Sequence, residues 1–467
     1  MKGKRIDKMN KRKIILRILG NELVPSFGCT EPAAVGLATS IAYNATKEIL
    51  PSWLQVRNTT ETVLDNLTQE NIEKIIVELD RFTYRNGLDA DIPGTGRRGI
   101  SVAAAQGVFC DPNKKLSIFE DSKAENVERI DRLLKAGKIK LRILDGRTSC
   151  IYIRARVLVK LPGRCSSEGI AIIQDAHTNV AFVQGNRRVL YRREEPLKSI
   201  LDLKALLMVG LEEIIDVVKS LSKEDYDLVR KSVEMNLEAA RVGIHNKPGL
   251  QIGSTLRRLV DEEVLGKDMI NHAVALTSAA VDARMAGCIV PVMSCAGSGN
   301  QGLMATLPIV AVAERWGWDE ERIVRAIALS YLITCYCTSH LGYLSTLCGG
   351  AIKAGVGAAA GIAHYLGGEV QQINSAMENM IEAVTGIICD GAKTSCAIKL
   401  AIVSGAVVES ALLALSGIVV PFQSGIKGKN LEETIKNVRK ISDSMTKTDE
   451  TILGIMSRAI SQESKHW

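Results

Sequence analysis

The chain has 467 residues, of which 46% are hydrophobic and 24% are charged, and its formal net charge is +7. This balance is ordinary for a globular protein and excludes both a disordered chain and a small disulfide-stapled domain. Because one domain usually holds roughly 100–200 residues, we expect at least two lobes. Aromatic residues make up only 4% of the chain and glycine occupies 39 positions, which predicts a core of small side chains and closely packed backbones.

The positive charge is concentrated at the start of the chain. Residues 1–13 contain seven lysines and arginines and one aspartate, so they carry +6 of the net +7. The rest of the chain is nearly neutral, which argues against nucleic acid as a partner. We interpret residues 1–18 as a basic, solvated tail of disordered character; the alternative is an arm that binds anions.

Cysteine usage suggests the compartment. There are eleven cysteines, an odd number, and a chain of this length does not need disulfides for stability. The apolar run at residues 14–19 is too short and too charged for the core of a signal peptide. We therefore expect a cytoplasmic protein, in which cysteines bind metal, catalyse or simply pack.

Two segments, residues 285–313 and 326–352, contain no Asp, Glu, Lys or Arg and are long enough to span a membrane. Polar or glycine-rich stretches interrupt both segments, at residues 294–302 and 338–340. Continuous helices that face lipid do not tolerate such centres, although the broken helices of transporters do. We expect buried helices of a bundle and no membrane partner.

The first predicted element is an apolar helix over residues 33–50, which follows the sequence Gly28-Cys29-Thr30-Glu31-Pro32. Thr30 suits the N-cap, and Glu31 and Pro32 suit the first turn. Cys29 would lie near the positive end of the helix dipole, which lowers the pKa of a thiol and favours the thiolate.

The middle and the end of the chain differ in character. Residues 73–79 and 102–109 look helical, whereas residues 152–159, 170–174 and 180–183 read as strands. From residue 197 onward only helical patterns occur, at residues 203–219, 224–242, 250–265 and 271–285 and in the charge-poor segments. The fold class is therefore expected to be α+β: a large, Gly/Ala-rich helical bundle of residues 19–58 and 196–467, with an α/β lobe of residues 59–195 inserted into it.

Three cysteines stand in glycine-containing surroundings. Cys348 precedes Gly349 and Gly350, and Cys389 and Cys396 lie either side of Gly391. Glycine lets the backbone approach a bulky inorganic ligand, and cysteine thiolates hold iron–sulfur clusters. The spacing fits no standard zinc motif, so on the residues alone a metal site and plain packing of buried cysteines both stay open.

Several motifs, taken in order, resemble the L-cysteine desulfidase family, which is related to the α-domain of iron–sulfur L-serine dehydratases. The resemblance covers about residues 20–415, and it rests on the segments 28–34, 93–96, 177–179, 297–302, 347–349 and 389–393. It implies a [4Fe–4S] cluster held by Cys348, Cys389 and Cys396, and it makes Cys29 the proton acceptor.

The implied reaction is the α,β-elimination of L-cysteine to pyruvate, ammonia and sulfide. An open iron of the cluster would act as a Lewis acid on the substrate carboxylate and the departing sulfur. The expected substrate-binding residues come from two places, one in each predicted domain: Ser298, Gly299, Asn300 and Gln301, and His177, Thr178 and Asn179. The alternative for the segment 297–302 is a helix break without a ligand, and the alternative for His177 is a surface turn residue.

Four alternatives remain open at this point. An iron–sulfur L-serine dehydratase would share the chemistry and exchange only the leaving group. A pyridoxal-phosphate eliminase would need a Schiff-base lysine and a phosphate loop, which the sequence does not suggest. A non-catalytic cysteine sensor or a membrane transporter would bind its ligand without releasing sulfide. The expected partner is a small amino acid, and the oligomeric state is open between a monomer and a homodimer.

Overall fold

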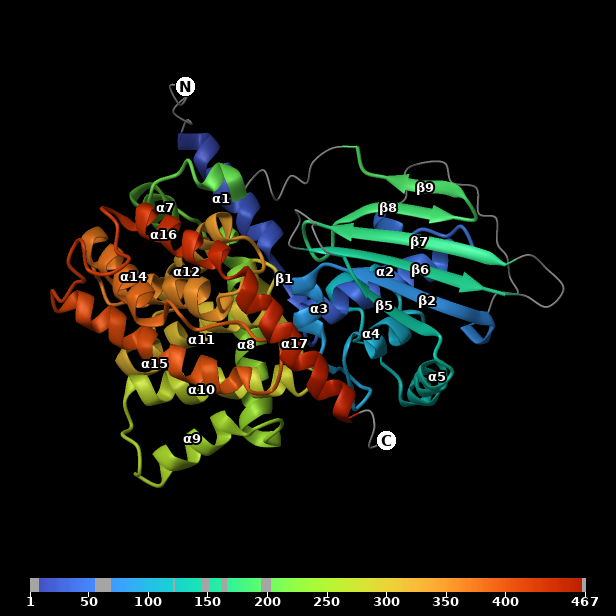
Figure 1. Cartoon of the computed structure of the whole chain (residues 1–467). Coiled ribbons are helices and arrows are strands. Elements are labelled where there is room, and N and C mark those ends of the chain that lie inside the picture. The colour runs from blue at the N-terminus through green and yellow to red at the C-terminus, as the bar shows by residue number, and fades with distance from the viewer. Residues whose placement is uncertain are drawn as a thin grey trace.

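The structure is a computed structural model of the whole chain. It describes residues 8–54, 69–120, 122–144, 151–160, 166–194 and 203–463. The molecule has two lobes (Figure 1). One is built of helices and the other around a six-stranded sheet, and each has its own core of buried apolar side chains. The expected α+β class is confirmed.

The sheet of the second lobe has the strand order β5-β2-β6-β7-β8-β9. β5 runs parallel to β2, and all other neighbours are antiparallel. Burial alternates along most of β6, so one face is packed and the other is more open. The strands are β2 (Ile72–Leu79), β5 (Ile139–Ile143), β6 (Tyr152–Val159), β7 (Ser167–Gln174), β8 (Val180–Gly185) and β9 (Arg188–Arg192).

The prediction of a helix at residues 73–79 is wrong, because these residues form β2. Ile75, Val77 and Leu79 are fully buried on one face of the strand. β-Branched side chains at alternate positions fit a half-buried strand better than a short helix. The predicted strands 152–159, 170–174 and 180–183 all lie within strands of the sheet.

Helix α2 (Thr30–Ala45) packs against β6, β7 and β8 and belongs to the core of the sheet lobe. This corrects the expectation that residues 19–58 belong wholly to the helical domain. α2 is buried on almost every side, and a Cβ added at Gly169 of β7 would lie only 1.9 Å from the carbonyl oxygen of Ala42. Glycine in the sheet thus lets the helix backbone approach directly. Helices α3 (Arg81–Gly87), α4 (Ile100–Gly107) and α5 (Ala124–Lys135) complete this lobe.

The expected disordered tail is helical from residue 8 onward, in α1 (Lys8–Glu22). Ile15 and Ile18 of this helix are buried in the core of the helical lobe. Two of its basic residues form ion pairs, Lys11 with Glu213 and Arg12 with Asp225. Apolar side chains and acidic partners therefore fix a segment that its charge alone made look solvated; residues 1–7 lie outside the described part of the chain.

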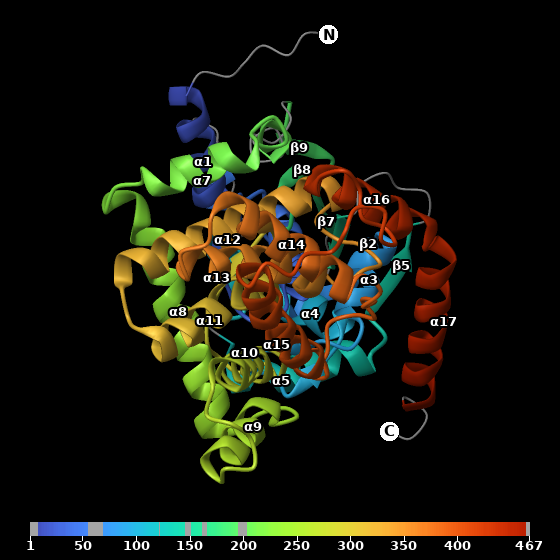
Figure 2. The same cartoon turned by 90° about the vertical axis from the view of Figure 1, so that its left-hand side faces the viewer.

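In the helical lobe, α11 (Gly299–Trp316) and α12 (Glu320–Leu341) lie among the other helices, and α9 (Ile252–Asp261) and α17 (Thr446–Glu463) lie at its outside (Figures 1 and 2). The first charge-poor segment contains strand β10 (Val292–Cys295), which pairs with β1 (Leu23–Ser26), and most of α11. The second contains most of α12, and most residues of α11 and α12 are buried. The helices are α7 (Leu211–Lys219), α8 (Asp227–Asn246), α9 (Ile252–Asp261), α10 (Met269–Met285), α11 (Gly299–Trp316), α12 (Glu320–Leu341), α13 (Val356–Tyr365), α14 (Val370–Val384), α15 (Cys396–Leu415), α16 (Leu431–Ser444) and α17 (Thr446–Glu463).

Within the described residues, one helix, α15, has the length and apolar composition to cross a bilayer. Half of its most apolar stretch is buried inside the protein. A core helix of a globular domain has the same composition.

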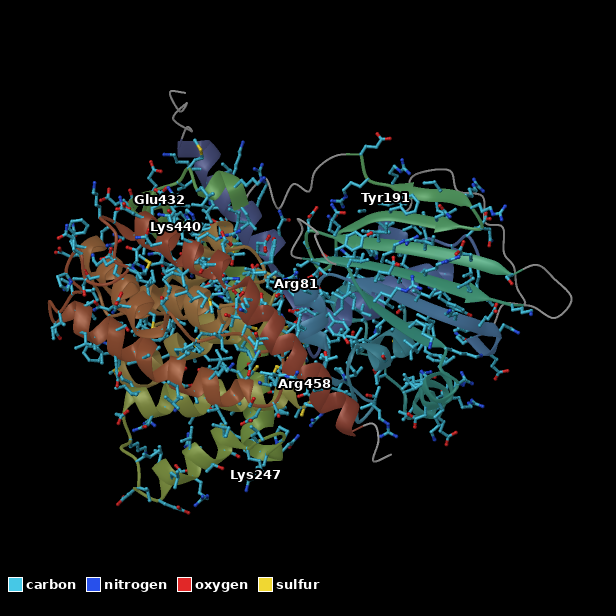
Figure 3. The ribbon with its side chains drawn as sticks, viewed as in Figure 1. Arg81, Tyr191, Lys247, Glu432, Lys440 and Arg458 are labelled. Carbon is cyan, nitrogen blue, oxygen red and sulfur yellow. The ribbon has the colours of Figure 1, made fainter. Side chains whose placement is uncertain are left out.

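Helix α17 lies across the junction of the two lobes (Figure 1). Its Asp449 forms a buried ion pair with Arg85 of α3, and both side chains are at most 3% exposed. Arg81, labelled at the same junction in Figure 3, lies 3.5 Å from Glu450 in a more exposed pair. The C-terminal helix therefore holds the sheet lobe against the helical lobe.

Candidate active site

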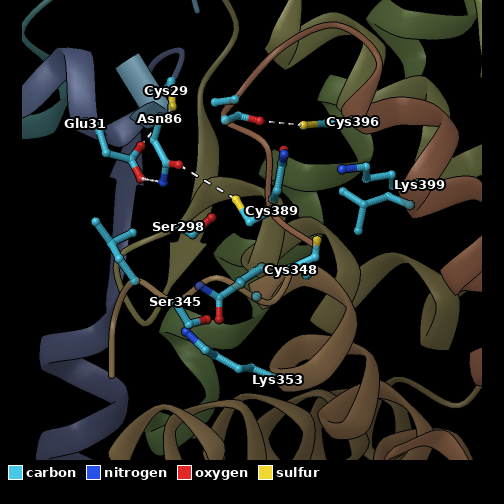
Figure 4. A pocket seen from close by; sticks show the side chains of 18 of the residues that line it. Cys29, Glu31, Asn86, Ser298, Ser345, Cys348, Lys353, Cys389, Cys396 and Lys399 are labelled. Atoms are coloured by element: carbon cyan, nitrogen blue, oxygen red, sulfur yellow. Dashed lines mark hydrogen bonds between the residues drawn. The ribbon is translucent and has the colours of Figure 1, made fainter. Parts of the chain in front are cut away.

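A pocket lies where the two lobes meet, and residues of both lobes line it (Figure 4). The sheet lobe contributes the start of α2 and the end of α3, and the helical lobe contributes the rest. The polar and sulfur-containing lining residues are Cys29, Glu31, Asn86, Arg284, Ser298, Asn300, Gln301, Tyr343, Ser345, Cys348, Lys353, Cys389, Cys396 and Lys399.

The structure brings together the three cysteines that the sequence singled out. A short antiparallel contact joins Leu347 to Ile388. In this contact, the amide N–H of Cys389 donates to the carbonyl oxygen of Thr346 at 2.7 Å. The amide N–H of Cys348 donates to the carbonyl oxygen of Ile387 at 2.8 Å. These bonds fix Cys348 and Cys389 on neighbouring loops.

Cys396 enters the same pocket from the first residue of α15. Its thiol lies 3.7 Å from the carbonyl oxygen of Gly391, and that of Cys389 lies 3.7 Å from Oδ1 of Asn86. Figure 4 shows the three sulfur-bearing side chains around one side of the cavity.

The three thiols influence one another. Burial raises the pKa of Cys396 to about 12, and nearby Cys348 and Cys389 add to this. Burial and Cys389 likewise raise the pKa of Cys348, whereas Lys399 opposes the shift at both cysteines. The ammonium of Lys399 is held by the carbonyl of Ile388 at 2.9 Å and by Asp390. A cation is thus built in next to the three potential thiolates.

Three free cysteines are the kind of donor set that holds an iron–sulfur cluster. Among the residues that the structure describes, no group of three or more His, Cys, Asp and Glu side chains is placed to bind one metal ion. In an iron–sulfur cube each cysteine binds a different iron, so its thiols must surround a volume and need not meet at a point. All three thiols are free and line one cavity, and this fits three ligands of a cluster.

Cys29 and Glu31 form a hydrogen-bonded pair on the opposite side of the pocket. Cys29 is the N-cap residue of α2, one position before the expected Thr30, and its side chain makes no capping bond. Instead its thiol donates to Oε2 of Glu31 at 2.9 Å. Glu31 also accepts from Nδ2 of Asn86 at 2.8 Å and from Oγ1 of Thr30 at 3.1 Å.

The expectation that the helix dipole keeps Cys29 ionised is wrong for this environment. Burial and the neighbouring carboxylate of Glu31 raise the pKa of Cys29 well above its usual value, and Arg284 only partly offsets this. Burial also raises the pKa of Glu31, but His177 and the hydrogen bonds from Cys29 and Asn86 outweigh it and hold that pKa below its usual value. The resting pair is therefore a thiol and a carboxylate.

Three of the four expected residues of the segment 298–301 line the pocket, and Gly299 does not. Ser298, Asn300 and Gln301 line it, and Ser298 is the N-cap residue of α11. A Cβ added at Gly299 would lie 2.3 Å from Nε of Arg284, so this glycine makes room for a guanidinium group. Gly302 has a different role, because a Cβ there would lie 1.8 Å from the carbonyl oxygen of Met293; this glycine lets α11 pack on β10.

The residues 177–179, which were expected to bind substrate, do not line the pocket. His177 is buried beside Gly297, whose added Cβ would lie 3.0 Å from Nδ1, and burial lowers the pKa of His177. It is buried and therefore not a surface residue, but it does not line the pocket. Thr178 and Asn179 do not line the pocket; they form the turn between β7 and β8, where Nδ2 of Asn179 donates to the carbonyl of Gln174 at 2.6 Å.

Sequence reasoning missed several polar residues of the pocket: Asn86, Arg284, Tyr343, Lys353 and Lys399. Three of them, Arg284, Lys353 and Lys399, carry a signal, because a charge within a largely apolar helical run needs a reason to be buried. Lys353 is the one charged residue in the run 347–363, and its buried ammonium donates to the carbonyls of Gly342 and Tyr343 after α12. Arg284 comes near the end of the apolar helix α10. Asn86 and Tyr343 carry no comparable signal.

Comparison with known proteins gives one family. Residues 113–454 match the family model described as the serine dehydratase alpha chain. A UPF0597 protein of Caldanaerobacter subterraneus is 36% identical over 448 residues, covering 95% of this chain and 98% of the relative. One of Clostridium tetani is 34% identical over 452 residues, with 96% and 99% covered, and one of Desulfatibacillum aliphaticivorans is 37% identical over 447 residues, with 94% and 97% covered.

Proposed function

Since this chain belongs to the serine dehydratase alpha chain family, which is related to the α-domain of the iron–sulfur serine dehydratases, we propose that it is a [4Fe–4S]-dependent lyase. Its proposed reaction converts L-cysteine and water into pyruvate, ammonia and hydrogen sulfide. The second candidate reaction is the dehydration of L-serine. The name of the matching family, serine dehydratase alpha chain, supports this candidate. The observation that carries the proposal is that three free cysteines and the Cys29–Glu31 pair line one pocket.

Cys348, Cys389 and Cys396 would hold the cluster. When bound, it supplies a Lewis acid for the departing sulfur or oxygen, through the iron that no protein thiolate binds. Lys399, next to two of these cysteines, would balance part of the negative charge of the bound thiolates.

The Cys29–Glu31 pair is suited to remove the proton from Cα of the substrate. The carboxylate of Glu31 is already hydrogen-bonded to the thiol of Cys29 at 2.9 Å. In the proposed step Glu31 takes the proton from Sγ of Cys29, and the resulting thiolate takes the proton from Cα. The electron pair of the broken C–H bond forms the Cα–Cβ double bond as hydrosulfide leaves, and the aminoacrylate then hydrolyses to pyruvate and ammonia.

The direct test measures both substrates on one preparation. The chain is purified anaerobically, and the release of sulfide and pyruvate from L-cysteine is compared with that of pyruvate from L-serine. A higher kcat/KM for L-cysteine supports the desulfidase, and a higher value for L-serine supports the dehydratase. A cluster-loaded protein that turns over neither amino acid contradicts the proposed function.

A further inference from the structure

Arg284 is a buried cation, and two of its three guanidinium nitrogen atoms make no hydrogen bond to the described residues. It lies near the C-terminal end of α10, is 3% exposed and lines the pocket. Its Nη1 donates to Oδ1 of Asn300 at 2.8 Å and lies 3.4 Å from the sulfur of Met285. Nε and Nη2 have no hydrogen-bond partner among the described residues.

No carboxylate in the described part of the chain pairs with this guanidinium. Asp282, two residues earlier, turns to the amide of Gly253, at 3.0 Å. Glu31 is engaged by the side chains of Cys29, Asn86 and Thr30. A buried charge without a counter-charge is costly, so its position in a pocket indicates that a ligand supplies the missing anion.

The two unused groups have the geometry of a carboxylate site. Nε and Nη2 lie on the same edge of the guanidinium, and two parallel N–H groups on one edge match the two oxygens of a carboxylate. Gly299 leaves room for the guanidinium, because a side chain there would begin 2.3 Å from Nε and 2.8 Å from Cζ. Asn300 holds the opposite edge, so the fork is fixed before a ligand arrives.

We propose that Arg284 binds the α-carboxylate of the substrate. This inference rests on the proposed function for its choice of an α-amino acid. It deepens that function by naming the group that recognises what cysteine and serine have in common. A carboxylate has about four lone-pair positions, so contact with Arg284 leaves room for a second contact with a Lewis acid.

The test measures binding without turnover. L-Alanine has the amino and carboxylate groups of the substrate but no leaving group, and L-alaninamide has a neutral amide in place of the carboxylate. Isothermal titration calorimetry with the anaerobically purified chain should show tighter binding of L-alanine than of L-alaninamide. R284Q should weaken the binding of L-alanine about 10- to 100-fold and leave L-alaninamide unchanged. R257Q, which removes an arginine exposed on α9, is the matched control. It should leave the affinities for both L-alanine and L-alaninamide unchanged.

Two further variants separate recognition from folding. R284K keeps the charge but loses the fork, so its affinity for L-alanine should lie between those of wild type and R284Q. N300D places a carboxylate against Nη1 of Arg284. Because this carboxylate offsets the charge of the guanidinium, N300D should weaken the binding of L-alanine although Arg284 is still present. Both are compared by thermal melting, so that a variant that fails to fold is recognised.

The outcomes distinguish this inference from the proposed function. Equal affinity of wild type for L-alanine and L-alaninamide, including no binding of either, contradicts the role of Arg284. So does a folded R284Q that binds L-alanine as wild type does, even if L-cysteine releases sulfide. Conversely, selective loss of L-alanine binding in R284Q supports the carboxylate site, even if wild type turns over no amino acid and the lyase proposal fails.

Discussion

The thiol of Cys29, the N-cap residue of α2, donates a 2.9 Å hydrogen bond to Oε2 of Glu31 in the first turn of that helix. Both side chains are almost completely buried, so the proton between them is shielded from bulk water. The carboxylate carries the charge and the thiol carries the proton at rest. The pair can therefore deliver a thiolate only when Glu31 accepts that proton.

The first prediction concerns this acceptor. E31Q keeps the shape of the side chain but removes the basic carboxylate, so turnover should fall by about 10²- to 10⁴-fold. The iron content should not change, because Glu31 is not one of the proposed ligands. E31D, which keeps a carboxylate, should retain more activity than E31Q. Wild-type kcat in E31Q, measured under anaerobic conditions, would show that Cys29 does not depend on Glu31.

The second prediction concerns the buried pair between Arg85 and Asp449. Asp449 also accepts from Oγ1 of Thr346 at 2.8 Å, and Arg85 donates to the carbonyl of Ser345 at 3.0 Å. D449N leaves the guanidinium without its counter-charge, which should lower the free energy of unfolding by about 3–5 kcal/mol. E450Q removes the neighbouring exposed pair and should cost less than about 1 kcal/mol. Equal urea midpoints for the two variants would show that α17 is not held by the buried pair.

The third prediction concerns pH and His364, at the end of α13. Burial, with Lys219, Arg325 and Arg322 nearby, lowers the pKa of His364 from 6.5 to about 4. Between these values the unfolded chain binds a proton that the folded chain does not, so the free energy of unfolding falls as the pH falls. The contribution of this residue should reach about 3 kcal/mol, and it should be fully lost near pH 4.

H364Q removes this titration. The difference in unfolding free energy between H364Q and wild type should therefore change between pH 7 and pH 4, in favour of H364Q at the lower pH. A difference that stays constant over this range would mean that His364 titrates alike in both states.

The fourth prediction concerns Gly302, where α11 crosses β10. G302A adds a methyl group that would lie 1.8 Å from the carbonyl oxygen of Met293, so it should destabilise the fold by about 1–3 kcal/mol. Gly454 in α17 has nothing within 4 Å of an added Cβ, and G454A should stabilise slightly through helix propensity. If G302A unfolds at the same denaturant concentration as wild type, the close approach of α11 to β10 is not required.

The sequence predicted elements well where one periodicity dominates. Burial alternates along most of 152–159, and these residues form a strand with the predicted bounds. It failed at 73–79, where Ile75-Ile76-Val77 fits a buried strand and a helix equally well on pattern alone. It also could not predict that α2 packs on the sheet, because a helix that is buried on nearly every side carries no stripe that points to its partner.

Part of the site was within reach of the sequence and part was not. Cys348, Cys389 and Cys396 could be proposed because several motifs in order resemble a family whose cysteines hold an iron–sulfur cluster; the residues alone left plain packing open. The ionisation of Cys29 was misjudged, because a helix dipole argument ignores the cost of burial and the charge of Glu31. Asn86 was beyond prediction, because its place beside Glu31 comes from the packing of α3 against α2, and no local pattern encodes that contact.

The measurement that most directly tests the central claim is the iron and acid-labile sulfide content of anaerobically purified C389S, compared with wild type, C29S and C288S. Cys288 is a half-buried cysteine outside the pocket, so C288S controls for the loss of a thiol. We predict about four irons per wild-type chain, the same in C29S and C288S, and iron lost in C389S. Wild-type protein without iron, or C389S with the iron content of C288S, would contradict a cluster held by Cys348, Cys389 and Cys396.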